Sequence, residues 1–276
     1  KWKTNEEAYR TLQAQINICR ELGVKMIIDP HDFVLKTHWN KGLNLKDEVI
    51  NKYIEMWNIL SKIGATNDDV VIGYDLYNEH QLKEGGFAVW GELANKLIEI
   101  IRFNDKKSVI YITGSLMANP DGMNNAYPVD NKDLNIEYSF HMYIPHSFTH
   151  QKVNSKRVSE PYLFYPGWIP PMDWGKTHYG SGPLKWFDKW TIGATMLPQY
   201  EFYARYKKYV HNGEFSVIGY SSPVANGSGL LWTKDVINWL ERNKISWNFW
   251  NHGFGFNNIG VKDYINTYWK SKKNKK

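Results

Sequence analysis

The chain is poor in the features that mark several protein classes. It has one cysteine, Cys19, so it cannot form an internal disulfide and its redox compartment is not indicated. No apolar run approaches the roughly 20 residues that a membrane-spanning helix needs, and we expect no membrane span. No glycine-rich phosphate loop follows a predicted strand, which argues against a nucleotide-binding sheet. The chain starts at Lys1 without a charged and apolar leader, so we expect no targeting signal in it.

The positive charge is concentrated at one end of the chain. The net charge is +6, but five lysines fall within the last seven residues, 270–276. The rest of the chain carries about +1, which is too little to attract a phosphate backbone. We therefore predict a solvated basic tail at 270–276 and no nucleic-acid partner.

Aromatic residues are unusually frequent. The chain has 13 Trp, 18 Tyr and 12 Phe, which together make 16% of its residues. One interpretation is a core packed with large side chains. The other is a cleft whose walls stack on the flat apolar faces of sugar rings, and composition does not separate the two.

Helical and strand patterns alternate along the chain. Strands are predicted at 24–29, 70–77, 108–113, 136–143, 215–218 and 245–250. Helices are predicted at 4–22, 46–63, 86–103, 195–210, 229–243 and 261–270. This alternation favours a parallel sheet with helical crossovers, either open or closed into a barrel. The length of 276 residues is near that of one α/β barrel, so we expect a single domain over 1–269.

Polar and aromatic residues stand at the predicted strand ends. In a parallel barrel the carboxyl ends of all strands meet at one face, where active sites are built. Glu79 and Glu214 would then face one another. Hydrolysis of an acetal needs such a pair, with one carboxyl protonated to donate to the leaving oxygen and the other ionised.

Five of these segments resemble motifs of glycoside hydrolase family 5, in order and spacing. They are Asp29-Pro30-His31, Asn78-Glu79, His141-Met142-Tyr143, Gly213-Glu214-Phe215 and the tryptophan region that ends at Trp250. The resemblance extends over nearly the whole chain. It implies a (β/α)8 TIM-barrel fold and a retaining endo-β-1,4-glycanase.

The resemblance also implies residue roles. Glu79 would be the acid/base and Glu214 the nucleophile, while Asn78 would bind a sugar 2-hydroxyl and Tyr143 would hydrogen-bond the nucleophile. Three further side chains would line the site, the last of them as a stacking platform: His31, His141 and Trp250.

Two departures from the family pattern stand out. The residue after Asn78-Glu79 is usually proline, and here it is His80. The match also begins at the helix before the family's third strand, so about six β/α units are visible and the strand-two arginine is not found. We expect either residues cut from a longer chain, which we favour, or a reduced barrel.

The segment 144–192 shows little periodicity and many aromatic residues. A segment this long between regular elements is usually functional or disordered, and its aromatic content argues against disorder. Its aromatic residues either form a cleft wall with extra sugar subsites or pack the segment on itself. His146 and His150 have helical metal-ligand spacing but no third ligand nearby, so we predict no metal site.

We therefore expect a secreted, cofactor-free glycoside hydrolase that cleaves cellulose or a related β-glucan. Mannan and xyloglucan are the nearest alternative substrates. The alternative from another class is a non-catalytic carbohydrate-binding pseudoenzyme. We expect no obligate protein partner.

Overall fold

The computed structural model describes residues 5–31, 48–80, 86–125, 132–151, 161–171, 182–217, 223–250 and 259–273. The chain divides into two compact units. Unit 1 comprises residues 1–118 and 122–139, and unit 2 comprises residues 119–121 and 140–276. The boundary between them falls inside one β-strand.

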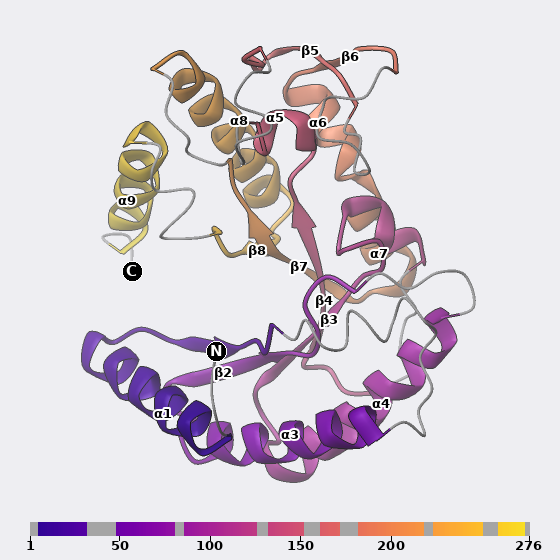
Figure 1. Ribbon diagram of the computed structural model, residues 1–276, viewed down its shortest axis with the longest axis vertical. Helices are drawn as coiled ribbons and strands as arrows, with labels where there is room; N and C mark the ends of the chain where they lie inside the picture. The colour runs from indigo at the N-terminus through magenta and orange to yellow at the C-terminus, as the bar shows by residue number, and fades with distance from the viewer. Residues whose placement is uncertain are drawn as a thin grey trace. The chain divides into compact units, whose positions relative to one another are not determined.

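The elements of unit 1 are, in chain order, α1 (Asn5–Leu22), β1 (Met26–Ile28), α3 (Glu48–Ala65), β2 (Val71–Asp75), α4 (Gly86–Asn104), β3 (Val109–Thr113) and the first part of β4 (Ile136–Met142). A 3-10 helix, η1 (Pro120–Asn125), lies between β3 and β4. The strands are hydrogen-bonded in the order β1-β2-β3-β4, and all three pairings are parallel. Helices α1, α3 and α4 follow one side of these strands (Figure 1).

Helix α3 shows how the sequence builds this unit. Its buried residues recur every three or four positions and are Ile50, Tyr53, Trp57, Leu60, Ser61 and Gly64. That spacing places them on one face, which packs on β2 and α4. Glycine is required at the end of this face, because a Cβ on Gly64 would lie 2.0 Å from the Tyr74 hydroxyl oxygen. The Tyr74 hydroxyl donates to Asp105 Oδ2 at 2.7 Å, which keeps the ring in this place.

Unit 2 contains the end of β4 and the elements that follow it. They are α5 (His146–Thr149), β5 (Gly167–Ile169), β6 (Lys185–Phe187), α6 (Lys189–Thr195), α7 (Leu197–Tyr206), β7 (Tyr209–Phe215), α8 (Pro223–Arg242), β8 (Ser246–Trp247) and α9 (Ile259–Lys273). The sheet continues from β4 to β7 and β8, and β7 pairs with β8 in parallel. Helix α8 packs against α6 and α9. The fully buried Phe215 and Trp232 lie at the centre of this unit, with ring centroids 6.4 Å apart.

Part of the 144–192 segment forms a small separate sheet. Strands β5 and β6 pair in antiparallel fashion, with Trp168 opposite Trp186 and their ring centroids 5.7 Å apart. Both rings are exposed, whereas Tyr165 is buried and donates to Asp235 Oδ2 at 2.8 Å. The segment thus has some aromatic side chains that pack inward and others that face solvent.

The first four predicted strands are confirmed as β1 to β4, and their parallel pairing confirms the α/β class. The prediction of the fifth strand was wrong. The strand comprises residues 209–215, whereas the sequence pattern predicted a strand at 215–218 and a helix up to 210. Helix α7 ends earlier because Lys207 adopts a left-handed conformation (φ 54°), and its N–H donates to the Tyr203 carbonyl. A lysine in that position carries no glycine-like stop signal. The sixth strand, β8, is shorter than the predicted 245–250.

Within the described part of the chain, no helix combines the length and apolar character that crossing a bilayer would require.

Candidate functional site

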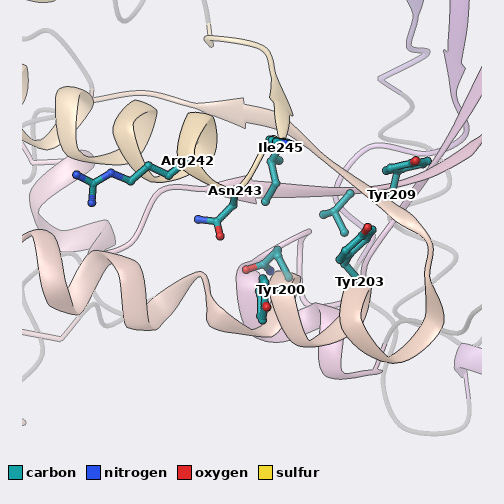
Figure 2. Close-up of a pocket in the computed structure, with 9 residues that line it drawn as sticks. Tyr200, Tyr203, Tyr209, Arg242, Asn243 and Ile245 are labelled. Atoms are coloured by element: carbon teal, nitrogen blue, oxygen red, sulfur yellow. The ribbon is translucent and has the colours of Figure 1, made fainter.

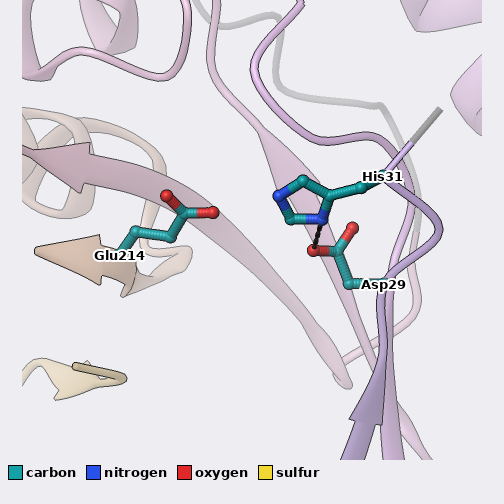
Figure 3. Close-up of side chains that lie close together, drawn as sticks. All are labelled: Asp29, His31 and Glu214. Atoms are coloured by element: carbon teal, nitrogen blue, oxygen red, sulfur yellow. Dashed lines mark ion pairs between the residues drawn. The ribbon is translucent and has the colours of Figure 1, made fainter. Parts of the chain in front are cut away.

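A histidine and an aspartate are paired just after β1 in unit 1. His31 Nδ1 lies 2.6 Å from Asp29 Oδ2 (Figure 3). Both side chains are about 30% exposed, with values of 30% and 28%. The pairing orients the His31 ring at the carboxyl end of β1, and the sequence did not identify Asp29 as its partner.

The turn after β2 carries Asn78 and Glu79. Asn78 is buried and Glu79 is partly exposed. Glu79 has a positive φ of 44°. A side chain in this region costs roughly 1–2 kcal/mol relative to the usual conformations, so the surroundings must hold the turn in place.

His80 is one of the residues that keep the turn at Glu79 in place. It is fully buried, and its Nε2 lies 3.0 Å from the carbonyl oxygen of Thr113 at the end of β3. Burial lowers the pKa of His80 to about 4, so the ring is neutral near pH 7 and Nε2 carries the proton that it donates to the carbonyl. Its ring packs 5.1 Å from that of Trp90.

A strained turn after β3 contacts the same residue. The Met117 N–H donates to the carbonyl oxygen of His80 at 2.9 Å. Leu116, Met117 and Ala118 all have positive φ, at 53°, 57° and 59°. Three successive non-glycine residues in this region are unusual and cluster at functional sites when they occur. The Glu79–His80 turn is therefore fixed through both the side chain and the backbone of His80.

In unit 2, three of the predicted site residues lie together. The Tyr143 hydroxyl donates to Glu214 Oε2 at 2.9 Å, and His141 Nδ1 lies 3.5 Å from the same oxygen. All three side chains are buried. Glu214 is at the carboxyl end of β7, while His141 and Tyr143 are at the carboxyl end of β4. Two groups from the end of β4 thus contact the same oxygen of the Glu214 carboxylate.

His211 is a buried residue of this region that the sequence did not identify. Asn248 Nδ2 donates to its Nε2 at 3.2 Å, so the ring proton is on Nδ1, which lies 2.8 Å from Ser246 Oγ. Burial, and then the charge of the nearby His141, lower the pKa of His211 to about 3. The residue escaped notice because β7 was predicted to begin at Phe215.

Trp250 is partly exposed and follows β8 in unit 2. Its backbone N–H donates to the Phe215 carbonyl at 3.0 Å, next to Glu214. Thus unit 2 brings together Glu214, His141 and Tyr143 and links the backbone of Trp250 to the residue after Glu214. The other predicted site residues, His31, Asn78 and Glu79, are in unit 1.

The sequence matches a known family along most of its length. The family model described as cellulase, glycosyl hydrolase family 5, matches residues 1–255. The chain belongs to glycosyl hydrolase family 5. It is therefore a glycoside hydrolase, and the resemblance seen in its strand-end motifs is confirmed.

The chain is similar to an endoglucanase and to several solved structures. Endoglucanase C of Acetivibrio thermocellus is 26% identical over 254 residues, which are 85% of this chain and 69% of that protein. Thermotoga maritima Cel5A, solved with cellobiose, has a TM-score of 0.69 and 20% identity, with 91% of this chain and 72% of that chain covered. The same enzyme has been solved with mannotriose. The cellulose synthase subunit Z of Clostridioides difficile has a TM-score of 0.69 and 18% identity, with 94% and 81% covered.

The structural likeness confirms the predicted fold. Family 5 structures are (β/α)8 barrels, and the described residues of this chain contain six parallel strands of that fold. In such barrels the active site is at the carboxyl ends of the strands, where all the predicted site residues are found.

The two buried neutral histidines make stability depend on pH. Unfolded histidine has a pKa near 6.5, whereas His80 and His211 in the folded protein have values of about 4 and about 3. As the pH falls below 6.5 the unfolded chain takes up protons that the folded chain does not, so folding becomes less favourable. Between pH 7 and pH 5 each histidine should lower the free energy of unfolding by about 2 kcal/mol. Urea unfolding at both pH values measures this effect.

The variants His80→Gln and His211→Gln are the controls for that measurement. Each variant should lose about 2 kcal/mol less of its free energy of unfolding between pH 7 and pH 5 than the parent does, whatever the substitution does to stability at pH 7. An unchanged pH dependence in both variants would show that these histidines have the same pKa in the folded protein as in the unfolded chain.

Proposed function

We propose that this chain is a retaining endo-β-1,4-glucanase, with Glu214 as the nucleophile and Glu79 as the acid/base. The observation that carries the proposal is the contact between Tyr143 and Glu214. The hydroxyl donates to Oε2 at 2.9 Å and fixes the orientation of the carboxylate at the end of β7. A carboxylate oriented in this way can attack the anomeric carbon.

His141 and Trp250 complete the unit 2 part of the proposed site. His141 Nδ1, 3.5 Å from Glu214 Oε2, further restricts the carboxylate. Trp250 is partly exposed, its backbone is hydrogen-bonded to the residue after Glu214, and its ring is of the kind on which the apolar face of a pyranose can stack.

Glu79 acts as the acid/base in this proposal. In the first step it donates a proton to the leaving oxygen while Glu214 forms the glycosyl-enzyme bond. In the second step Glu79, now ionised, takes a proton from the water that hydrolyses the intermediate. The turn that His80 fixes holds the Glu79 backbone, which places the carboxyl group for both transfers. Asn78 binds the sugar 2-hydroxyl, and His31, oriented by Asp29, lines the site.

A β-glucan is the substrate that the relatives favour. Endoglucanase C is named for action within a glucan, and Cel5A was solved with cellobiose. A mannan is the second candidate, because Cel5A was also solved with mannotriose. A polymeric substrate of this kind supports action outside the cell. That residues 1–269 work as one catalytic domain, followed by the basic segment 270–276, is part of the proposal. Residues 270–273 are the end of α9, where the exposed Lys272 has its Nζ 2.8 Å from Glu241 Oε2.

The test is hydrolysis of several β-linked polysaccharides followed by the anomeric configuration of the product. Incubation with carboxymethylcellulose, barley β-glucan, xyloglucan and glucomannan should release reducing ends, most rapidly from a β-glucan. Proton NMR should show the β-anomer first, because two displacements restore the original configuration. The α-anomer as first product would overturn the retaining mechanism. Binding without release of reducing ends, by folded protein, would favour the pseudoenzyme.

A further inference from the structure

Unit 2 has a concave surface at the amino ends of β7 and β8. A cavity of about 270 Å³ lies between α7, the start of β7 and the loop from α8 to β8 (Figure 2). Tyr209, at its wall, is the first residue of β7, and Ile245 directly precedes β8. Glu214 is five residues further along β7, about 16 Å away at the rise of an extended strand. The cavity is thus separate from the catalytic residues of this unit.

Three tyrosines give the cavity its aromatic wall. Tyr200, Tyr203 and Tyr209 are 52%, 43% and 62% exposed. The rings of Tyr203 and Tyr209 are tilted by only 31°, with centroids 6.1 Å apart. Exposed rings gathered around a concave surface are typical of sites that bind a ligand or a partner. Their apolar faces and hydroxyl groups suit a ligand that is flat, apolar on its faces and polar at its edges.

The rest of the wall is polar. Arg242, Asn243 and Lys244 line the cavity, and neither Arg242 nor Lys244 forms an ion pair with any described residue. Gln199 also lines it and is fully buried, and its Nε2 donates to the Pro120 carbonyl at 2.9 Å. Its Oε1 is buried without a hydrogen-bond partner among the described residues. The groups of this wall that a ligand can use as donors are therefore those of Arg242, Asn243 and Lys244.

A second cavity, of about 590 Å³, continues this surface along α8. Arg242 lines both cavities, which makes them neighbours. The wall of the second one includes Trp190, which is 72% exposed, together with Trp239 and Asn238. Lys189 Nζ lies 5.0 Å from the centroid of the Trp190 ring. Aromatic rings thus stand on both sides of Arg242, with amide and charged groups between them.

We propose that these two cavities form a secondary binding site for a β-linked glucan chain. Exposed rings stack on the C–H faces of successive pyranoses, and Arg242, Asn243 and Asn238 hydrogen-bond their hydroxyls. The substrate class follows from the proposed function, on which this inference rests. A phosphate or carboxylate ligand fits less well, because its negative charge would meet the carboxyl group of Asp235 in the second cavity. Such a site would keep a polymer on the enzyme between cleavages and raise its effective concentration at the catalytic residues.

The test measures glucan binding by a form that does not hydrolyse it. In a Glu214→Gln background, Tyr200→Ala/Tyr203→Ala and Arg242→Gln are compared by affinity electrophoresis in gels with barley β-glucan. Each should raise the dissociation constant about fivefold or more. Phe103→Ala is the matched control, since it removes an 80% exposed ring from unit 1, and it should change binding less than twofold. Thermal melting verifies that each variant is folded, and Arg242→Gln still tests the site if the double variant is not.

Two further measurements separate the possible outcomes. Dextran sulfate in place of β-glucan tests simple charge attraction, and an equal loss of binding to it would overturn the proposal. Unchanged β-glucan binding in both folded variants would also overturn it. Hydrolysis of an aryl β-cellobioside by the chain with Glu214 intact reports the proposed function on its own. If the cellobioside is cleaved while the variants keep full binding to β-glucan, the secondary site is wrong and the proposed function stands. If the cellobioside is not cleaved while the variants lose binding, the proposed function is wrong and the secondary site stands.

Discussion

Replacing Glu214 by Gln is expected to lower kcat for β-glucan about ten-thousand-fold, equivalent to about 5.5 kcal/mol of transition-state stabilisation. The glutamine has the same shape, and its amide oxygen can still accept from the Tyr143 hydroxyl. It cannot form a stable bond to the anomeric carbon, so the glycosyl-enzyme intermediate is lost. Because the contacts of the side chain are kept, the melting temperature should change little. Reducing-end release and thermal unfolding measure the two effects.

Glu201→Gln is the control for that variant. Glu201 is an exposed residue of α7 in the same unit, and the substitution makes the same change in charge. It should leave kcat within a factor of two. If Glu214→Gln kept more than about a tenth of the parent's kcat, Glu214 would not be the nucleophile.

Replacing Glu79 by Gln should have an effect that depends on the leaving group. A glucan leaves as a strongly basic alkoxide and needs a proton, so its cleavage should fall about a thousandfold. Dinitrophenyl β-cellobioside has a leaving group that needs no proton, so formation of the glycosyl-enzyme should stay fast. The intermediate then accumulates, because water has no base to activate it. Stopped-flow measurement should show a burst of dinitrophenol followed by slow turnover.

Glu21→Gln serves as the control for Glu79. Glu21 is an exposed residue of α1 in unit 1, and its replacement should change the rate of cleavage of neither substrate. Azide, which attacks without a base, should speed the slow phase of the Glu79 variant. Equal losses on both substrates, without a burst, would contradict the assignment of Glu79 as acid/base and point to a role in binding.

Much of the fold could be predicted because unit 1 obeys simple patterns. The buried face of α3 repeats every three or four residues, and β2 and β3 are short apolar runs between helices. The start of β7 could not be predicted in the same way. Helix α7 ends at Lys207 in a left-handed conformation, and the helical pattern of the sequence continues beyond that residue. Tertiary packing determines this end, and local propensity does not.

In the candidate site too, some features could be predicted from the sequence and others could not. The identities of Glu79 and Glu214 came from motifs at strand ends, since those positions can be read from the sequence. The bond from His80 to the Thr113 carbonyl joins residues 33 positions apart, and His211 meets Ser246 over 35 positions. Such pairs depend on the register of β2 with β3 and of β7 with β8. No single sequence reveals a register in advance.

The boundary between the two compact units, inside β4, constrains how this gene can be rearranged. Ser139 belongs to unit 1 and Phe140 to unit 2, yet both are interior residues of the same strand. A crossover that swapped one unit for its counterpart from a related gene would join β4 halves of different parentage. The first half of the new strand would have to pair with β3, and its second half would have to fit the strands of unit 2. Chimeras that break the chain outside 136–142 avoid this double requirement and should more often yield folded protein.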